Sequence, residues 1–134
     1  MHTIDSFMQG NNKNEILLED EIIELMLDLG FSPHIRGFNY VAESIRMTVE
    51  DTAVILKATR DLYPAIAEKY GTSAARVERC IRHAIERAWI LGNLETINEI
   101  FGYSVDFNRG RPTNSEFIAL AALRIKQYLR NEKV

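Results

Sequence analysis

Apolar residues recur along the chain with the spacing of helices, and this pattern predicts an all-α protein. From Glu15 an apolar stripe runs to Gly30, which is placed to end the first helix. A second helix is expected over about Phe38–Glu50, and Asp51 or Thr52 is expected to cap a third. The apolar positions of that third helix are Val54, Ile55, Leu56 and Leu62.

The second half of the chain predicts four more elements. Pro64 suits the first turn of the helix "YPAIAEKYG", which Gly71 ends, and Thr72 or Ser73 then caps a long helix to about Leu91. "LETINEIFG" is a short helix, and "YSVDFNRGRP" is a loop with room for a strand-like stretch. The final helix, "TNSEFIALAALRIKQYLR", begins with Thr113 three residues before Glu116, which is the spacing of a capping box. We therefore expect a compact bundle of about six helices.

The length of the chain indicates one domain, and the distribution of its charge indicates a class of partner. Residues 1–14 are polar and predict a flexible arm or linker remnant, and residues 15–134 are expected to form one domain. The net charge is −3, but residues 1–58 hold four basic and ten acidic residues, against twelve and nine in residues 59–134. A basic C-terminal half favours a polyanion as partner. The chain shows no signal peptide and no membrane span, so we expect a cytoplasmic protein without membrane contact.

A helix-turn-helix is indicated by the spacing of small and apolar residues across 64–91. Ala67 allows two helices to cross closely, Gly71 four positions later allows a left-handed turn, and Val77 follows at the tenth position after Ala67. The predicted inner face of this unit comprises Ile66, Tyr70, Val77 and Ile81. On this prediction, 64–71 is the positioning helix and 73–91 is the recognition helix.

The outer face of the second helix has two interpretations. The predicted inward stripe is Val77, Ile81, Ala84, Ile85 and Ala88. Arg76, Arg79 and His83 share one other face, and Arg82 also lies off the inward stripe. An arginine that donates two hydrogen bonds to guanine would make this a DNA-reading surface, and Glu78 would accept from a cytosine amino group. On the other interpretation the face is solvated, and Glu78 pairs with Arg82 at i+4.

Several stretches resemble the effector domain of the stage-zero sporulation response regulator, a transcription-factor family. They are "LYPAIAEKYGTSAARVERCIRHAIERAW", "GFNYVAESI", "ETINEIFGY" and "RPTNSEFIALAA", and the resemblance as a whole spans roughly residues 17–130. The resemblance implies a six-helix domain that binds double-stranded DNA at a TGTCGAA-like box as a tandem dimer, activates or represses, and contacts the RNA polymerase sigma factor.

By motif match, the resemblance also implies site residues. Those expected to contact bases are Arg76, Glu78, Arg79, Arg82 and His83. Those expected to contact phosphate are Lys69, Thr72, Ser73, Arg109 and Arg111. Those expected on the sigma-factor or partner surface are Ile90, Leu91, Asn93, Glu95 and Asn98.

This chain departs from the family pattern at three places. Ala75 stands where a serine is usual, Cys80 stands where an alanine is usual, and Ile90–Leu91 replaces a polar residue and an arginine after the tryptophan. The last change questions the activating contact and offers an apolar surface to a different partner. The receiver domain with its phosphoacceptor aspartate is also absent, so the sequence is either an excised domain or a receiver-less relative.

Other functional classes find little support in the sequence. No glycine-rich phosphate loop or nucleophile–base spacing is present, so no enzyme activity and no cofactor are predicted. Cys80 lacks the cysteine and histidine partners of a zinc site, so no metal is predicted, and it is expected to be a small buried residue. Trp89 is expected in the core, and 114–116 is expected to cap a helix. The main alternative to DNA binding is a helical protein-interaction module of the same ancestry.

Overall fold

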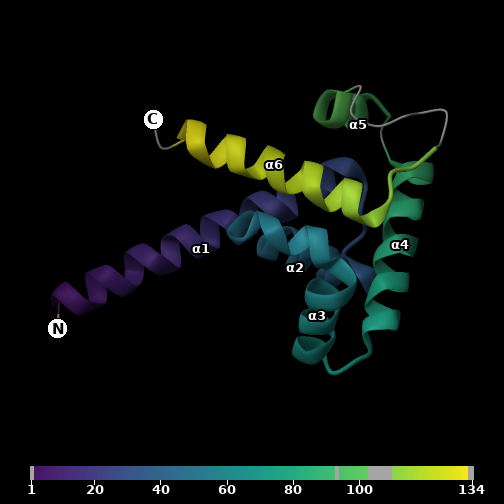
Figure 1. Ribbon diagram of the computed structural model, residues 1–134. Helices are drawn as coiled ribbons and strands as arrows, with labels where there is room; N and C mark the ends of the chain where they lie inside the picture. Colours follow the sequence, from purple (N-terminus) through teal and green to yellow (C-terminus); the bar gives the residue numbers. More distant parts are fainter. Residues whose placement is uncertain (1, 93, 103–109, 133–134) are drawn as a thin grey trace.

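The computed structural model describes residues 2–92, 94–102 and 110–132 (Figure 1). Within these residues the chain forms six α-helices and no strand, which confirms the all-α prediction. The helices are α1 (His2–Leu29), α2 (Gly37–Glu50), α3 (Tyr63–Tyr70), α4 (Ala74–Leu91), α5 (Leu94–Phe101) and α6 (Asn114–Glu132). Most of the loop predicted to hold a strand-like stretch, residues 103–109, lies outside the described residues.

The core surrounds α2, which packs against α1, α3, α4 and α6. At one end of this core an aromatic cluster joins the loop after α1 to α4, α5 and α6. Phe117 is fully buried at its centre, with ring centroids 5.3 Å from Phe31, 5.9 Å from Trp89 and 5.6 Å from Phe101. Trp89 therefore closes α4 against α6, as the sequence predicted, and the cluster fixes the C-terminal half of α4.

Helix α1 begins much earlier than the sequence predicted. The expected start was Glu15, but the helix runs without interruption from His2 to Leu29, and its N-terminal half projects away from the other helices (Figure 1). Gly10 and the asparagines after it lower helix propensity by at most about 1 kcal/mol each, which weakens a helix without ending it. Gly30 ends the helix as predicted, with φ of 98°. The assignment of 1–14 as a separate arm remains a prediction.

In place of the predicted third α-helix the chain forms one segment that is wound more tightly than an α-helix and a second that is wound more widely. Residues Thr52–Lys57 form a 3₁₀ helix (η1), and Ala58–Leu62 form a π-helical turn (η2) that leads directly into α3. Asp51 does cap this segment, because its carboxylate accepts a hydrogen bond from the Ala53 N–H at 3.1 Å. The 3.6-residue pattern fails here since a 3₁₀ helix repeats every three residues. As a result Leu56, expected inside, is 85% exposed, while Leu62 is buried.

The first turn of α6 is anchored by a capping box and by a long-range tie. Thr113 and Glu116 exchange hydrogen bonds of 3.2 Å in both directions, which confirms the predicted capping box. Asn114 then donates from Nδ2 to the Tyr63 hydroxyl at 3.3 Å and to the Glu78 backbone carbonyl at 3.2 Å. Burial raises the pKa of Tyr63, partly offset by this Asn114 contact. The start of α6 is thus bonded to both α3 and α4.

Candidate nucleic-acid interface

The turn between α3 and α4 has the geometry that its residues predict. Gly71 adopts a left-handed backbone with φ of 65° and ψ of 43°. The Thr72 N–H donates to the Ala67 carbonyl at 2.9 Å, which closes the end of α3. Ser73 caps α4, because its hydroxyl oxygen accepts from the Arg76 N–H at 3.2 Å. These three residues set the angle at which α4 leaves α3.

The inner faces of α3 and α4 pack as a helix-turn-helix requires. Ile66, Val77 and Ile81 are fully buried, and Ala67 is 5% exposed at the crossing. All five residues of the predicted inward stripe of α4 are buried. Tyr70 is a wrong prediction, because it is 40% exposed and its ring packs edge-on against Tyr40 of α2, 5.3 Å away, instead of facing α4. The arrangement is consistent with a helix-turn-helix.

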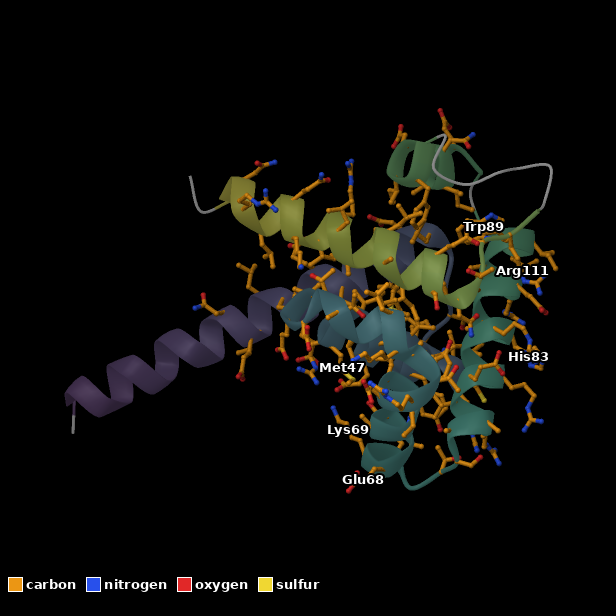
Figure 2. All side chains as sticks on the ribbon, in the orientation of Figure 1. Met47, Glu68, Lys69, His83, Trp89 and Arg111 are labelled. Carbon is orange, nitrogen blue, oxygen red and sulfur yellow. The ribbon has the colours of Figure 1, made fainter. Side chains whose placement is uncertain are left out.

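The free face of α4 carries a row of basic side chains over three turns. We call Arg76, Arg79, His83 and Arg87 the basic stripe; all four are exposed. Their spacing of three and four residues places them on one face of the helix, opposite the core (Figure 2 shows His83 pointing outward from α4). Among the described residues, none of the four forms a salt bridge. Arg87 was not among the predicted site residues, although its position four residues after His83 was a sufficient signal.

The two carboxylates of α4 lie beside the basic stripe and are both paired. Glu78 and Arg82 form an i,i+4 ion pair with an Oε1–Nη1 distance of 2.5 Å. Glu86 pairs with Arg111 at 2.8 Å, which draws the segment before α6 onto α4 (Figure 2). Because these acids are occupied on the flank of the helix, they leave the positive charge of the stripe uncompensated. Arg82 is half-buried and joined to Glu78, whereas Arg76 and Arg79 are exposed and form no salt bridge with any residue that the structure describes.

Lys69, at the end of α3, is tied to a buried carboxylate of α2. Its ammonium lies 3.0 Å from Oε2 of Glu43, a side chain that is only 9% exposed and that also pairs with Arg46. Burial alone would raise the pKa of Glu43, but the hydrogen bonds and charges of Arg46 and Lys69 outweigh it, so that this pKa is lowered. Glu43 therefore stays ionised and joins α3 to α2. No local pattern in the sequence indicates this role, since Lys69 and Glu43 are 26 residues apart.

The remaining residues predicted to contact phosphate differ in exposure and in their position relative to α4. Ser73 is exposed and Thr72 is half-buried, and both lie in the turn that precedes α4. The Ser73 oxygen is used as an acceptor by the cap, so its hydroxyl hydrogen is still able to donate. Arg111 is exposed beside α4, and Arg109 lies outside the described residues.

The predicted partner surface contains an exposed apolar pair at the end of α4. Ile90 is 79% exposed and Leu91 is 64% exposed. Glu95 and Asn98 are exposed on α5, and Asn93 lies outside the described residues. The structure therefore places the apolar pair next to α5, at the opposite end of α4 from Ser73.

Two findings bear on the class of protein to which the chain belongs. Among the described residues, none of the helices is both long and apolar enough to span a membrane. The family model described as "Sporulation initiation factor Spo0A C terminal" matches residues 22–125, which is most of the chain. This is a family of DNA-binding transcription-regulator domains, the effector domains of a sporulation response regulator, and not a family of enzymes. The chain, with its capped α3–α4 unit and its basic stripe, belongs to the Spo0A C-terminal DNA-binding family.

Proposed function

We propose that the chain is a sequence-specific regulator of transcription that places α4 in the major groove of a TGTCGAA-like box. The carrying observation is the basic stripe, which is exposed, unpaired among the described residues and directed away from the core. A helix fits the major groove, and arginine recognises guanine there with two hydrogen bonds. Arg76 and Arg79 are nearest the N-terminal end of α4, which is the end that usually meets the bases in a helix-turn-helix.

Glu78, Arg82 and His83 complete the proposed reading surface. Glu78 holds Arg82 in place, so these two side chains enter the groove as one paired unit and not as independent readers. His83 extends the row one turn beyond Arg79. Because Glu78 and Arg82 depend on each other, replacing Arg79 is the clearest test of base reading: its loss breaks no salt bridge within the described part of the domain.

Phosphate contacts in the proposal come from the turn before α4. The free N–H groups at the start of a helix and the hydroxyls of Thr72 and Ser73 favour a phosphate there. Lys69 and Arg111 would contact the DNA backbone while they remain paired with Glu43 and Glu86, which neutralise part of their charge. Arg109 belongs to the same proposal because it lies two residues before Arg111 in the sequence, on the other side of Gly110. Two domains side by side on adjacent boxes would form the tandem dimer.

The experiment is fluorescence anisotropy on one duplex with two tandem boxes and one scrambled duplex, each at two salt concentrations. Wild-type protein should prefer the boxes and lose affinity steeply with salt, with a log–log slope of about −0.9 per neutralised phosphate. Arg79→Ala should weaken binding to the box by about 1–3 kcal/mol and relax one base position. If Arg79→Ala binds both duplexes as the wild type does, α4 is not the reading helix.

A second candidate function rests on the Ile90–Leu91 pair. Two neighbouring apolar side chains with most of their surface in water favour contact with another protein. The candidate partners are another regulator and the RNA polymerase sigma factor, although the change from a polar residue and an arginine to Ile90–Leu91 questions the sigma contact that the family resemblance implies. An interface of this kind is mostly apolar, so its affinity should change little with salt. Ile90→Ser with Leu91→Ser should abolish sigma binding in a pull-down and leave box binding intact; loss of box binding instead would contradict this separation.

A further inference from the structure

Arg87 is the one member of the basic stripe that is not among the proposed base contacts. It is exposed on α4, four residues after His83, and it pairs with no carboxylate among the described residues. The neighbouring Glu86 is already bound to Arg111. Arg87 is therefore available to a ligand other than the bases proposed for Arg76 and Arg79.

The distance of Arg87 from Arg76 and Arg79 along α4 indicates which part of the DNA it would meet. An α-helix rises 1.5 Å per residue, so Arg87 lies about 16 Å beyond Arg76 and about 12 Å beyond Arg79. The major groove is about 12 Å wide. With Arg76 and Arg79 at the bases, Arg87 is carried to the edge of the groove, where the neighbouring group is a phosphate of the DNA backbone.

A second basic side chain is held beside this part of α4 by the segment that joins α1 to α2. One end of the segment meets the residue that caps α4 and the other meets α4 itself: a Cβ on Gly30 would stand 2.7 Å from the Gly92 Cα, and one on Gly37 would stand 2.3 Å from the Cys80 carbonyl oxygen. Arg36 immediately precedes Gly37 and is exposed. It forms no salt bridge among the described residues, and the segment "GFSPHIRG" contains no acidic residue.

The position of Cys80 links the two arginines. Cys80 is four residues after Arg76 and seven before Arg87, so it lies along the border of the basic stripe. Because Gly37 packs on Cys80 and Ala84, the backbone of Arg36, one residue earlier, lies beside that same border. Two exposed arginines, one on α4 and one immediately before α2, thus lie beside the same border of the helix, and neither forms a salt bridge among the described residues.

We propose that Arg87 and Arg36 bind phosphates of the DNA backbone at this edge, as a contact that holds the domain on the duplex without reading sequence. The proposal rests on the proposed function, since it needs α4 to face DNA. Backbone contacts fix the register and orientation of a protein on the duplex, whereas base contacts supply the specificity. Arg87 and Arg36 should therefore affect affinity and its salt dependence and leave the choice of sequence unchanged.

The test is the salt dependence of binding to a single-box duplex and to a scrambled duplex for Arg87→Ala, Arg36→Ala and a control, Arg124→Ala. Arg124 is exposed on α6 and forms no salt bridge in the described part of the chain. Each test variant should reduce the log–log slope by about 0.9, so that raising salt from about 50 to 200 mM costs it about threefold less affinity than it costs the wild type. The ratio of the two affinities at a given salt should equal that of the wild type.

The outcomes separate the two proposals. A slope equal to that of Arg124→Ala overturns the assignment of whichever arginine gives it, and a reduced preference for the box would mean that the residue reads bases instead. Failure of the proposed function looks different: wild-type protein would bind both duplexes equally, while the slopes of the variants would still report on the backbone contact. Circular dichroism melting of each variant confirms that the fold is retained.

Discussion

Replacing Gly37 with alanine tests the contact that sets the distance between α2 and the proposed reading helix. Gly37 is the first residue of α2, and its backbone is not in the left-handed region, so that alanine is allowed there by conformation. Helix propensity alone predicts that the change stabilises the protein, by at most about 1 kcal/mol. The packing around Gly37 predicts the opposite sign.

The magnitude follows from the space at the helix crossing. The new Cβ would stand 2.3 Å from the carbonyl oxygen of Cys80 and 3.1 Å from the Cβ of Ala84, whereas ordinary contacts begin at 3.4 Å. The two helices must separate by about 1 Å, and the obstructing atom belongs to a backbone that cannot rotate away. Overpacking of this kind costs about 1–3 kcal/mol. After a gain in propensity of about 1 kcal/mol, we expect Gly37→Ala to lower the free energy of unfolding by up to about 2 kcal/mol.

Urea denaturation followed by circular dichroism measures this free energy, and Asn39→Ala is the matched control. Asn39 is exposed on the same helix, so its replacement should give only the small propensity gain. Gly37→Ala should also weaken DNA binding, because the displaced residue Cys80 follows Arg79 directly. A Gly37→Ala protein that is as stable as Asn39→Ala and binds DNA like the wild type would refute the reasoning.

Two further predictions concern the core. Glu43→Gln should destabilise the fold by about 1–3 kcal/mol at neutral pH. Because the pKa of Glu43 is lowered from 4.5 in the folded protein, the ionised carboxylate stabilises the wild type above pH 4.5. This extra stability is lost as the pH falls through the lowered pKa. Urea titrations at about pH 7 and pH 3 check this, and a difference that does not shrink in acid contradicts it. Phe117→Ala should cost about 3–5 kcal/mol because it empties the centre of the aromatic cluster. Leu123→Ala, at a 49% exposed position of the same helix, is the control, and equal losses would show that Phe117 is not central.

The sequence predicted well what depends on residues close together in the chain. The inward stripe of α4 was predicted in full, because five apolar residues at helical spacing leave no alternative face to bury. The left-handed Gly71, the Ser73 cap and the Thr113–Glu116 box were also predicted, since each is set by side chains within a few positions. The basic stripe was predicted from the same spacing, except for Arg87.

Features that depend on distant residues were not predictable in this way. The bond from Lys69 to Glu43 and the bonds from Asn114 to Tyr63 and Glu78 join residues 26 to 51 positions apart, and no local pattern announces them. Tyr70 was assigned to the wrong neighbour for the same reason: periodicity gives the face of a helix but not which helix covers it. The turns at 52–62 failed because propensity and spacing do not distinguish 3₁₀ and π geometry from an α-helix.

The tie made by Asn114 bears on how this domain can be engineered. One amide group holds a side chain of α3 and a carbonyl of α4 from an element that comes more than twenty residues after α4 ends. A chimera that transplants only residues 63–91 would carry every side chain of the basic stripe, yet it would lack the two hydrogen bonds by which Asn114 joins α3 to α4. Transfer of binding specificity to another scaffold therefore requires either the first turn of α6 or a designed substitute for it.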